Sequence, residues 1–353
     1  MRAAVLQGHA ITVEDMPDPV PARGQLLVRP LMTGICGSDL SLRKQMTALE
    51  QGLEVEARAG LPKIVPGHEF CAELVEAGPG TETALRPGAR LTAVPFTHGH
   101  AGPETIGLSP VFSGGLATLC LVDAERTFAV PDGMPADLAA LTEPLAVGAH
   151  AVNLATRNRA PNVVIGCGPV GLAVILSLRL QGRGPILAAD FSAQRRARAA
   201  ELGADIVVDP AESSPYERWG DLGFKPALMS PLLERELRER PKGCNIFECS
   251  GAPGVLGQII ASAPGHAHII VVGVCPHEEK VTPLEGILRE LTVDFSFAYR
   301  PAEFTESLAM IAAHPDLAAR LITSRLPLAE TEDAFDRLSS NPDEVKILIT
   351  PQH

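Results

Sequence analysis

The stretch "VVIGCGPVGLA" (163–173) decides the fold, because it joins a short apolar strand to an apolar helix through closely spaced glycines. Gly166, Gly168 and Gly171 form the pattern GxGxxG. The first glycine of this pattern makes a tight turn, the second lets the backbone approach a pyrophosphate, and the third lets helix and strand pack closely. Phosphates then lie at the helix N-terminus. The stretch predicts a dinucleotide-binding fold, with a glycine-rich turn that serves packing alone as the alternative.

An acidic residue stands where this fold needs one. Asp190 ends the next strand, "PILAAD" (185–190), and an acid there bonds the ribose hydroxyls and repels a 2′-phosphate. We therefore expect NAD rather than NADP, although Arg195 and Arg196 could accommodate a phosphate. The candidate cofactor-binding residues are Gly166, Gly168, Pro169, Val170, Gly171, Asp190, Arg195, Val272, Gly273 and Val274.

Strands and helices alternate on both sides of this motif. A polar-faced helix at 192–205 is followed by strands in "CNIFECSG" (244–251), "HAHIIVVGV" (266–274) and "LTVDFSFAY" (291–299). Such alternation predicts an α/β fold with a doubly wound parallel sheet of the Rossmann type. The stretch 210–242, rich in proline and charge, gives no clear element.

The two ends of the chain have a different pattern. Residues 1–130 contain short apolar runs broken by Gly and Pro, which is typical of a β-rich domain. The tail has two helical stretches and a last strand, "VKILIT" (345–350). We expect one domain from 1–152 with 301–353, and a nucleotide-binding domain at 153–300.

Composition excludes several classes of function. The chain has 353 residues and a net charge of −12, which argues against nucleic-acid or anionic-membrane partners. The longest apolar run is broken by glycines and proline, and the N-terminus does not have the pattern of a secretory signal. The seven cysteines include no CxxC pair. An odd number of scattered thiols favours a cytoplasmic protein, with some cysteines as metal ligands.

A second group of residues has metal-binding chemistry. "TGICGSDL" contains Cys36, "VPGHEF" contains His68 and Glu69, and "LTEPLAVGAHA" contains Glu143. A thiolate, an imidazole and carboxylates together suit Zn²⁺. Each lies in a turn at the end of an element, where side chains can converge. Spacing alone leaves open that each is an ordinary buried residue.

Four motifs in this order, "GICGSD", "GHE", "EPLAVG" and "GCGPVG", resemble those of the zinc-dependent medium-chain alcohol dehydrogenases. "EPLA" resembles the polyol and threonine dehydrogenase branch. The resemblance implies a GroES-like β-rich catalytic domain plus a Rossmann domain. It also implies zinc ligation by Cys36, His68, Glu69 and, directly or through water, Glu143. Ser38 falls at the family's proton-relay hydroxyl.

The sequence departs from the family in two places. No cysteine occurs at 90–110, where the family carries a structural zinc, so we expect one catalytic zinc per chain and no structural zinc. His98 and His100 in that stretch are more typical of solvated loop residues. The segment 43–64 is longer than the family pattern and either shapes the substrate pocket or forms a surface loop. By resemblance, Asp39 is a structural acid, and Lys346 is its expected partner.

The implied reaction is oxidation of a secondary alcohol to a ketone. Zinc would lower the pKa of the alcohol, Ser38 would carry the proton away, and hydride would pass to the nicotinamide. The substrate could be a polyol, a hydroxy-amino acid or another alcohol. The alternatives are a zinc-free medium-chain reductase of quinones or enoyl compounds and a non-catalytic NAD-binding protein.

Assembly is suggested by the last strand of the predicted sheet. The stretch 291–299 would lie at a sheet edge, with two phenylalanines and Asp294 as its one charge. Monomers usually protect such an edge with lysine, proline or a bulge. We expect a homodimer or homotetramer held partly by this strand, with an edge covered by the tail as the alternative.

Overall fold

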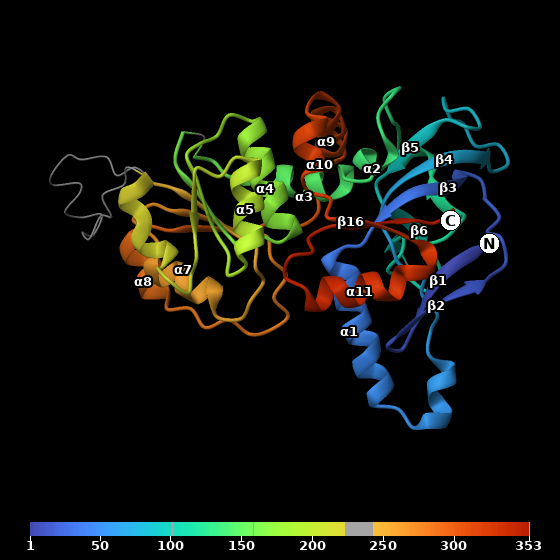
Figure 1. The fold of residues 1–353 in the computed structure, drawn as a ribbon, viewed down its shortest axis with the longest axis horizontal. Coiled ribbons are helices and arrows are strands. Elements are labelled where there is room, and N and C mark those ends of the chain that lie inside the picture. The colour runs from blue at the N-terminus through green and yellow to red at the C-terminus, as the bar shows by residue number, and fades with distance from the viewer. Residues whose placement is uncertain (100–101, 158, 223–242, 353) are drawn as a thin grey trace. The chain divides into compact units, whose positions relative to one another are not determined.

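The computed structural model describes residues 1–99, 102–157, 159–222 and 243–352 (Figure 1). The chain forms two compact units. The split unit consists of Met1–Glu143 with Phe304–His353, and the continuous unit is Pro144–Glu303. The expected catalytic domain at 1–152 with 301–353 and the expected nucleotide-binding domain at 153–300 stay a prediction.

The continuous unit is built on a six-stranded sheet in the order β12-β11-β10-β13-β14-β15. All neighbouring strands run parallel. Two halves start at the sheet centre, from β10 and β13, and extend in opposite directions, which is the strand order of dinucleotide-binding sheets. The expected doubly wound sheet is confirmed. Its strands are β10 (Asn162–Ile165), β11 (Ile186–Ala189), β12 (Ile206–Val208), β13 (Asn245–Glu248), β14 (His268–Val271) and β15 (Thr292–Phe295).

The helices of this unit follow from local sequence signals. Helix α4 begins with Pro169 and is mostly buried, which matches its apolar sequence. Helix α5 begins after Ser192, whose Oγ accepts a hydrogen bond from Arg195 N, and ends at Gly203, whose φ is +114°. The helical elements are α4 (Pro169–Leu180), α5 (Ala193–Leu202), η3 (Pro215–Leu222), α7 (Val255–Ser262) and α8 (Pro283–Arg289). Helices α3 (Thr142–Leu154) and α9 (Pro301–Ala313) contain the divisions between the units.

The split unit contains a seven-stranded sheet in the order β16-β17-β3-β4-β5-β9, with β8 also paired to β3. Strand β17 comes from the tail and runs antiparallel to β3, so the two chain ends form one sheet. The sheet strands are β3 (Gln25–Gly34), β4 (Glu69–Ala77), β5 (Arg90–Ala93), β8 (Cys120–Asp123), β9 (Thr127–Ala129), β16 (Ser324–Pro327) and β17 (Ile347–Thr350).

Smaller elements complete this unit. Two hairpins are formed by β1 (Arg2–Gln7) with β2 (Ala10–Asp15) and by β6 (Phe96–Gly99) with β7 (Gly102–Thr105). The helices are α1 (Gly37–Gln51), α2 (Ala136–Ala139), α10 (Pro315–Ala319) and α11 (Thr331–Ser340). Short 3₁₀ helices are η1 (Val55–Gly60), η2 (Ala124–Arg126) and η4 (Leu328–Glu330).

The long segment 43–64 packs within the split unit. Arg43 Nη1 binds Asp336 of α11 at 2.6 Å, and Glu50 Oε2 binds His9 of the β1–β2 turn at 2.8 Å. Met46 and Leu61 join a buried cluster with Phe335 of α11. The segment thus covers α11 and the first hairpin. That the segment also shapes the substrate pocket stays a prediction.

Some details differ from expectation. The strand expected at 291–299 is shorter, because β15 ends at Phe295 and Ala298 has a φ of +53° that an extended strand does not allow. Part of the unclear stretch 210–242 forms η3 with Trp219 buried, and 223–242 lies outside the described residues. His100 also lies outside them. None of the helices in the described part of the chain combines the length and the apolar composition of a membrane-spanning segment.

Candidate metal centre and dinucleotide loop

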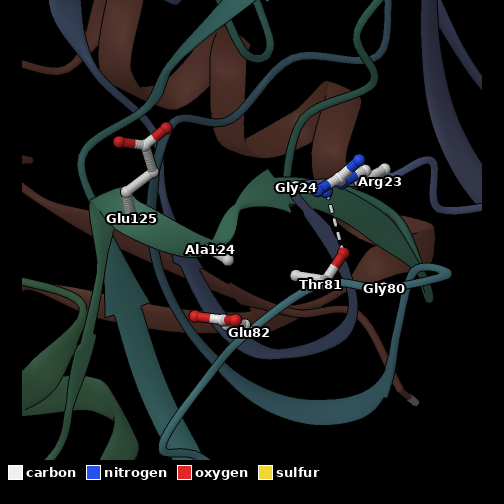
Figure 2. Close-up of a pocket in the computed structure, with 7 residues that line it drawn as sticks. All are labelled: Arg23, Gly24, Gly80, Thr81, Glu82, Ala124 and Glu125. Atoms are coloured by element: carbon white, nitrogen blue, oxygen red, sulfur yellow. Dashed lines mark hydrogen bonds between the residues drawn. The ribbon is translucent and has the colours of Figure 1, made fainter.

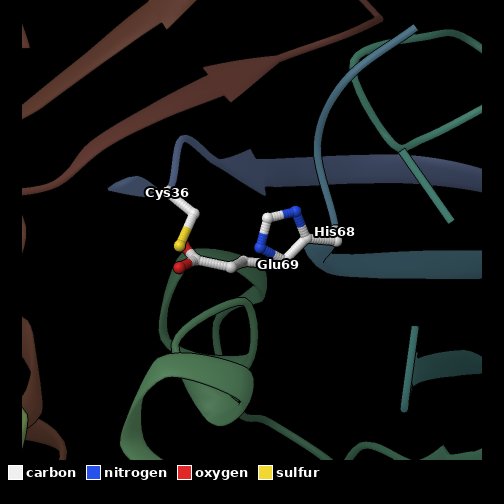
Figure 3. Close-up of side chains that lie close together, drawn as sticks. All are labelled: Cys36, His68 and Glu69. Atoms are coloured by element: carbon white, nitrogen blue, oxygen red, sulfur yellow. The ribbon is translucent and has the colours of Figure 1, made fainter. Parts of the chain in front are cut away.

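Three of the predicted zinc ligands lie together in the split unit. One ligand atom from each of Cys36, His68 and Glu69 lies within 4.8 Å of the others (Figure 3). His68 and Glu69 are buried, and Cys36 is partly exposed. In Figure 3 one ring nitrogen of His68 points toward Cys36 and Glu69. A thiolate, an imidazole and a carboxylate at this separation fit a zinc ion, with room for a further ligand.

The pairing of β3 with β4 explains why these residues meet. Gly34 lies opposite Glu69 in the antiparallel register, so Cys36 and His68, just beyond that pair, come from adjacent chain segments. A Cβ atom on Gly34 would lie 2.3 Å from Glu69 Oε2. Glycine at this position therefore makes space for the carboxylate. The motifs "GICGSD" and "GHE" are brought together by one β-sheet contact.

Asp39 and Ser38 lie beside the two nitrogens of His68. Asp39 Oδ1 is 3.4 Å from Nδ1, and Ser38 Oγ is 3.2 Å from Nε2. Asp39 is itself fixed, because its carboxylate accepts hydrogen bonds from the backbone N–H groups of Cys36 and Gly67. A carboxylate behind one nitrogen is the usual way to orient an imidazole whose other nitrogen binds metal. This geometry favours Nε2 as the metal-binding atom.

The electrostatics of His68 reflect these neighbours. Burial acts to lower the pKa of its imidazole, but the negative charges of Asp39 and Cys36 outweigh burial and hold the pKa well above its ordinary value. In the absence of a metal ion the imidazole therefore keeps its proton to a higher pH than an ordinary histidine does. A zinc ion would supply the positive charge in its place, because a metal ligand must be neutral imidazole.

Lys346 supplies a second positive charge, and its partner differs from the expectation. Its Nζ lies 2.7 Å and 2.5 Å from the two carboxylate oxygens of Glu69 and donates to Ile35 O at 3.2 Å. The expected pair of Lys346 with Asp39 is therefore wrong. The reason is the strand register, since β17 begins one residue after Lys346 and pairs with β3 at Thr33 and Gly34, opposite Glu69.

The charge on Lys346 is retained despite burial. Only 2% of the residue is exposed, and burial acts to lower its pKa, but Glu69, Cys36 and Glu143 raise the pKa above its ordinary value. Glu143, in the first turn of α3, is therefore electrostatically close to the site. The compact ligand group in the described residues comprises only Cys36, His68 and Glu69. Direct ligation by Glu143 stays a prediction.

The glycine loop of the continuous unit has the expected geometry. Gly166 has a φ of +91°, and a Cβ atom on Gly171 would lie 1.9 Å from Gly166 O, so both positions require glycine. A Cβ atom on Gly168 would meet no atom within 4 Å. Gly168 is the N-cap of α4, and Pro169 is the first helical residue. The second glycine thus leaves open space at a helix N-terminus, as a phosphate-binding loop needs.

Asp190 holds this loop to the next strand. Its Oδ2 accepts a hydrogen bond from Cys167 N at 2.8 Å, and its Oδ1 accepts one from Ser192 N at 2.8 Å. Arg196 is engaged, because its Nη2 is 2.8 Å from Asp209 Oδ2 and its Nη1 donates to Asp190 O. Arg195 donates its backbone N–H to Ser192 Oγ. One of the two arginines that could bind a 2′-phosphate is thus already paired with an acid.

The segment Val272 to Val274 lies at the end of β14. The backbone N–H groups of Val272 and Gly273 both donate to Glu248 O at 2.8 Å, and Val274 is exposed. Glu248 itself was missed by sequence reasoning, although it is an acid at the end of a central strand, as Asp190 is. Such a position was the signal that could have found it.

A shallow pocket elsewhere on the split unit carries none of these groups (Figure 2). It is lined by Arg23, Gly24, Gly80, Thr81, Glu82, Ala124 and Glu125. Gly24 N donates to Thr81 Oγ1 at 2.8 Å, so two of the lining residues bind each other. The candidate metal ligands and the glycine loop lie elsewhere in the chain.

Two family models match this chain. A family model described as an alcohol dehydrogenase GroES-like domain matches residues 22–132, and one described as a zinc-binding dehydrogenase matches residues 169–313. The chain belongs to the zinc-dependent medium-chain alcohol dehydrogenase family. It is an oxidoreductase that acts on alcohols with a nicotinamide cofactor. The fold expected by resemblance, GroES-like plus Rossmann, is confirmed.

Individual relatives are similar over nearly the whole chain. (R,R)-butanediol dehydrogenase of Bacillus subtilis is 30% identical, over 97% of this chain and 96% of its own. Human sorbitol dehydrogenase is 26% identical, over 92% of this chain and 89% of its own. The crystal structure of 2R,3R-butanediol dehydrogenase from Bacillus subtilis has a TM-score of 0.82 and covers 99% of both chains at 27% identity. A zinc-binding dehydrogenase of Sinorhizobium meliloti, solved with NADP, has a TM-score of 0.80 at 27% identity over 99% of both chains.

Proposed function

We propose that this protein oxidises a secondary alcohol of the polyol or vicinal diol class to a ketone, with NAD as hydride acceptor. The observation that carries the proposal is the convergence of Cys36, His68 and Glu69 in one buried group. The named activities of relatives support the substrate class, since they include butanediol and sorbitol dehydrogenases. A galactitol-1-phosphate dehydrogenase of Escherichia coli also shares the fold, with a TM-score of 0.80 at 25% identity over 99% of this chain and 100% of its own.

In the split unit, different residues would bind the metal, transfer the proton and orient the imidazole. Cys36, His68 and Glu69 would hold a zinc ion, with Glu143 as a further ligand directly or through water. The bound ion would polarise the substrate hydroxyl. Ser38, whose Oγ is 3.2 Å from His68 Nε2, would accept and pass on the hydroxyl proton. Asp39 would keep the His68 ring in the ligand orientation.

NAD is proposed over NADP because of Asp190. Its carboxylate, which would bind the ribose hydroxyls, is held beside the glycine loop by Cys167 N, and Arg196 is occupied by Asp209. NADP is the alternative cofactor, because one relative of known structure was solved with NADP bound. Asp190→Ala should narrow the ratio of kcat/KM for NAD to that for NADP, whereas the exposed Glu212→Ala should leave the ratio unchanged. Faster turnover of NADP by the wild-type protein would contradict the proposal.

A substrate screen tests the proposal directly. Zinc-loaded protein is assayed for NAD reduction with the stereoisomers of 2,3-butanediol, sorbitol, galactitol 1-phosphate and L-threonine. We expect turnover of at least one polyol or diol, its loss in Cys36→Ala and His68→Ala, and its retention in Cys120→Ala. NADH binding should survive in His68→Ala, because the glycine loop lies in the other unit. A folded, zinc-loaded wild type that turns over no alcohol in the screen would refute the proposed substrate class.

Two competing functions are less well supported. A zinc-free reductase of quinones or enoyl compounds would not need a thiolate, an imidazole and a carboxylate within 4.8 Å of one another. A non-catalytic NAD-binding protein would not need them either. Reduction of a quinone by a zinc-free protein would favour the first alternative, and NADH binding without any turnover would favour the second.

The edge of the six-stranded sheet bears on the oligomeric state of the protein. We propose a homodimer or higher oligomer, because β15 is an edge strand and exposed apolar residues gather on it, on α8 and after β14. These residues are Val274, Val281, Leu284, Ile287, Leu288, Phe295 and Phe297. The tail strands pair in the other sheet instead.

A cytoplasmic location is supported by the seven unpaired cysteines.

A further inference from the structure

Glu248 is a buried acid whose carboxylate organises the turn that follows β13. Only 3% of the residue is exposed. Its Oε1 accepts hydrogen bonds from Ser250 N at 2.8 Å, from Ser250 Oγ at 2.5 Å and from Gly251 N at 2.9 Å. Ser250 Oγ in turn accepts one from Ala252 N at 3.1 Å. One carboxylate oxygen therefore fixes the backbone of the turn 249–251.

This turn is wedged between two segments that are expected to bind the cofactor. On one side, a Cβ atom on Gly166 would lie 2.9 Å from Ser250 Cα. On the other side, a Cβ atom on Gly273 would lie 2.2 Å from Gly251 N and 2.8 Å from Glu248 Oε2. Because the backbone of the turn packs this closely against both glycines, it has no space to shift. Its position therefore depends on the hydrogen bonds that shape it.

The sheet topology indicates which half of a dinucleotide lies nearby. Strand β13 begins the second half of the sheet, and Asp190 follows β11 of the first half. In this fold each half binds one mononucleotide, beyond the carboxyl ends of its strands. Asp190 therefore serves the adenosine half. The turn 249–251, with the segment 272–274, stands at the half that would hold the nicotinamide nucleotide.

We propose that Glu248 is a positioning residue for the nicotinamide half of the cofactor, acting through the turn 249–251. The inference rests on the proposed use of a dinucleotide. Glu248 need not touch the cofactor. Its role is to hold the Ser250 and Gly251 backbone in place between the glycine loop and Gly273. The charge matters because three donors converge on one oxygen, and a carboxylate holds them more strongly than an amide oxygen.

The experiment compares two ligands on the full-length protein by calorimetry. NADH probes both halves of the site, and ADP probes the adenosine half alone. We expect Glu248→Gln to weaken NADH binding about tenfold, since a charge-assisted contact is replaced by a neutral one. ADP binding should stay within about twofold of wild type by the same arithmetic. Ser250→Ala, which removes one of the three donors, should act in the same direction with a smaller effect.

Controls separate this role from a general effect on folding. Glu212→Gln removes an exposed acid of the same unit and should change neither affinity, and thermal unfolding checks that every variant is folded. Equal losses of NADH and ADP affinity in Glu248→Gln, or no loss of NADH affinity, would overturn the inference. A wild-type protein that binds ADP but not NADH would instead overturn the proposed function, and the inference with it.

Discussion

The carboxylate of Glu69 faces two positive partners, the ammonium of Lys346 in the structure and the metal that the family binds. The ion pair is buried on both sides, with Glu69 fully inaccessible and Lys346 2% exposed. Removing one partner of a buried pair leaves the other charge uncompensated, which costs far more than breaking a surface pair. Lys346 therefore balances the buried negative charge of Glu69 in the ligand group.

Substitution of Lys346 tests this. We expect Lys346→Met to lower the free energy of unfolding of zinc-free protein by about 3–5 kcal/mol. Zinc-loaded protein should lose less, because the metal supplies positive charge to Glu69. Urea unfolding with and without zinc measures both values. Lys63→Met removes a half-exposed pair with Glu14 and should cost at most about 1 kcal/mol. Equal small losses in the two variants would show that the buried pair is unimportant.

The raised pKa of His68 makes zinc binding dependent on pH. Zinc must displace a proton from the imidazole whenever the pH lies below that raised pKa, so zinc affinity should increase as the pH rises from 6.5, the ordinary value. Asp39→Asn removes the stronger of the two charges that raise the pKa and should flatten this dependence. Competition with a chromophoric chelator over a pH series measures it. Asp137→Asn, a variant of an acid paired with Arg325, is the control. A slope that Asp39→Asn leaves unchanged would contradict this account.

At the scale of elements, the glycine loop permits a matched pair of substitutions. Gly168→Ala adds a methyl group in open space, so the thermal midpoint should stay within a degree or so while NADH binding falls at least about tenfold. Gly171→Ala places the methyl group 1.9 Å from Gly166 O, so both stability and binding should fall. Thermal unfolding and calorimetry distinguish the two. Unimpaired NADH binding in Gly168→Ala would mean that phosphates do not approach this glycine.

Short-range sequence patterns predicted the elements better than they predicted long-range pairing. The glycine loop and "GHE" are local, because their function requires adjacent residues, and the strand order follows from alternating elements. The partner of Lys346 depended on the register of β17 against β3, which no local pattern encodes. Strand β15 ends at Phe295, and the left-handed backbone that follows at Ala298 belongs to a residue with no turn preference of its own.

At the scale of the whole molecule, metal content is a simple count. We expect one zinc per chain, because the ligand group occurs once in the described part and no cysteine lies at 90–110. Elemental analysis of protein purified without chelators measures the ratio. Cys36→Ala should lower it toward zero, whereas Cys120→Ala should leave it near one. Two tightly held zinc ions per wild-type chain would reveal a second site.

Assembly is tested at the β15 edge. Phe295 and Phe297 are 72% and 84% exposed, and burying them against a second copy would remove apolar surface and pair the open strand edge. We expect light scattering at micromolar concentration to give at least a dimer mass. The double variant Phe295→Glu with Phe297→Glu should shift the mass toward monomer. Phe191→Glu, which changes a phenylalanine 73% exposed elsewhere, should not. A monomeric wild type would refute the proposed assembly.

The pairing of β17 with β3 also has a consequence for synthesis on the ribosome. Glu69 and Lys346 are separated by 277 residues, so the continuous unit emerges completely before the split unit can close its sheet. Domains generally fold as they emerge. The continuous unit can therefore fold during translation. Glu69 has no ammonium partner until Lys346 leaves the exit tunnel. A nascent chain that stalls before this point carries the complete glycine loop, whereas its group of Cys36, His68 and Glu69 still lacks Lys346.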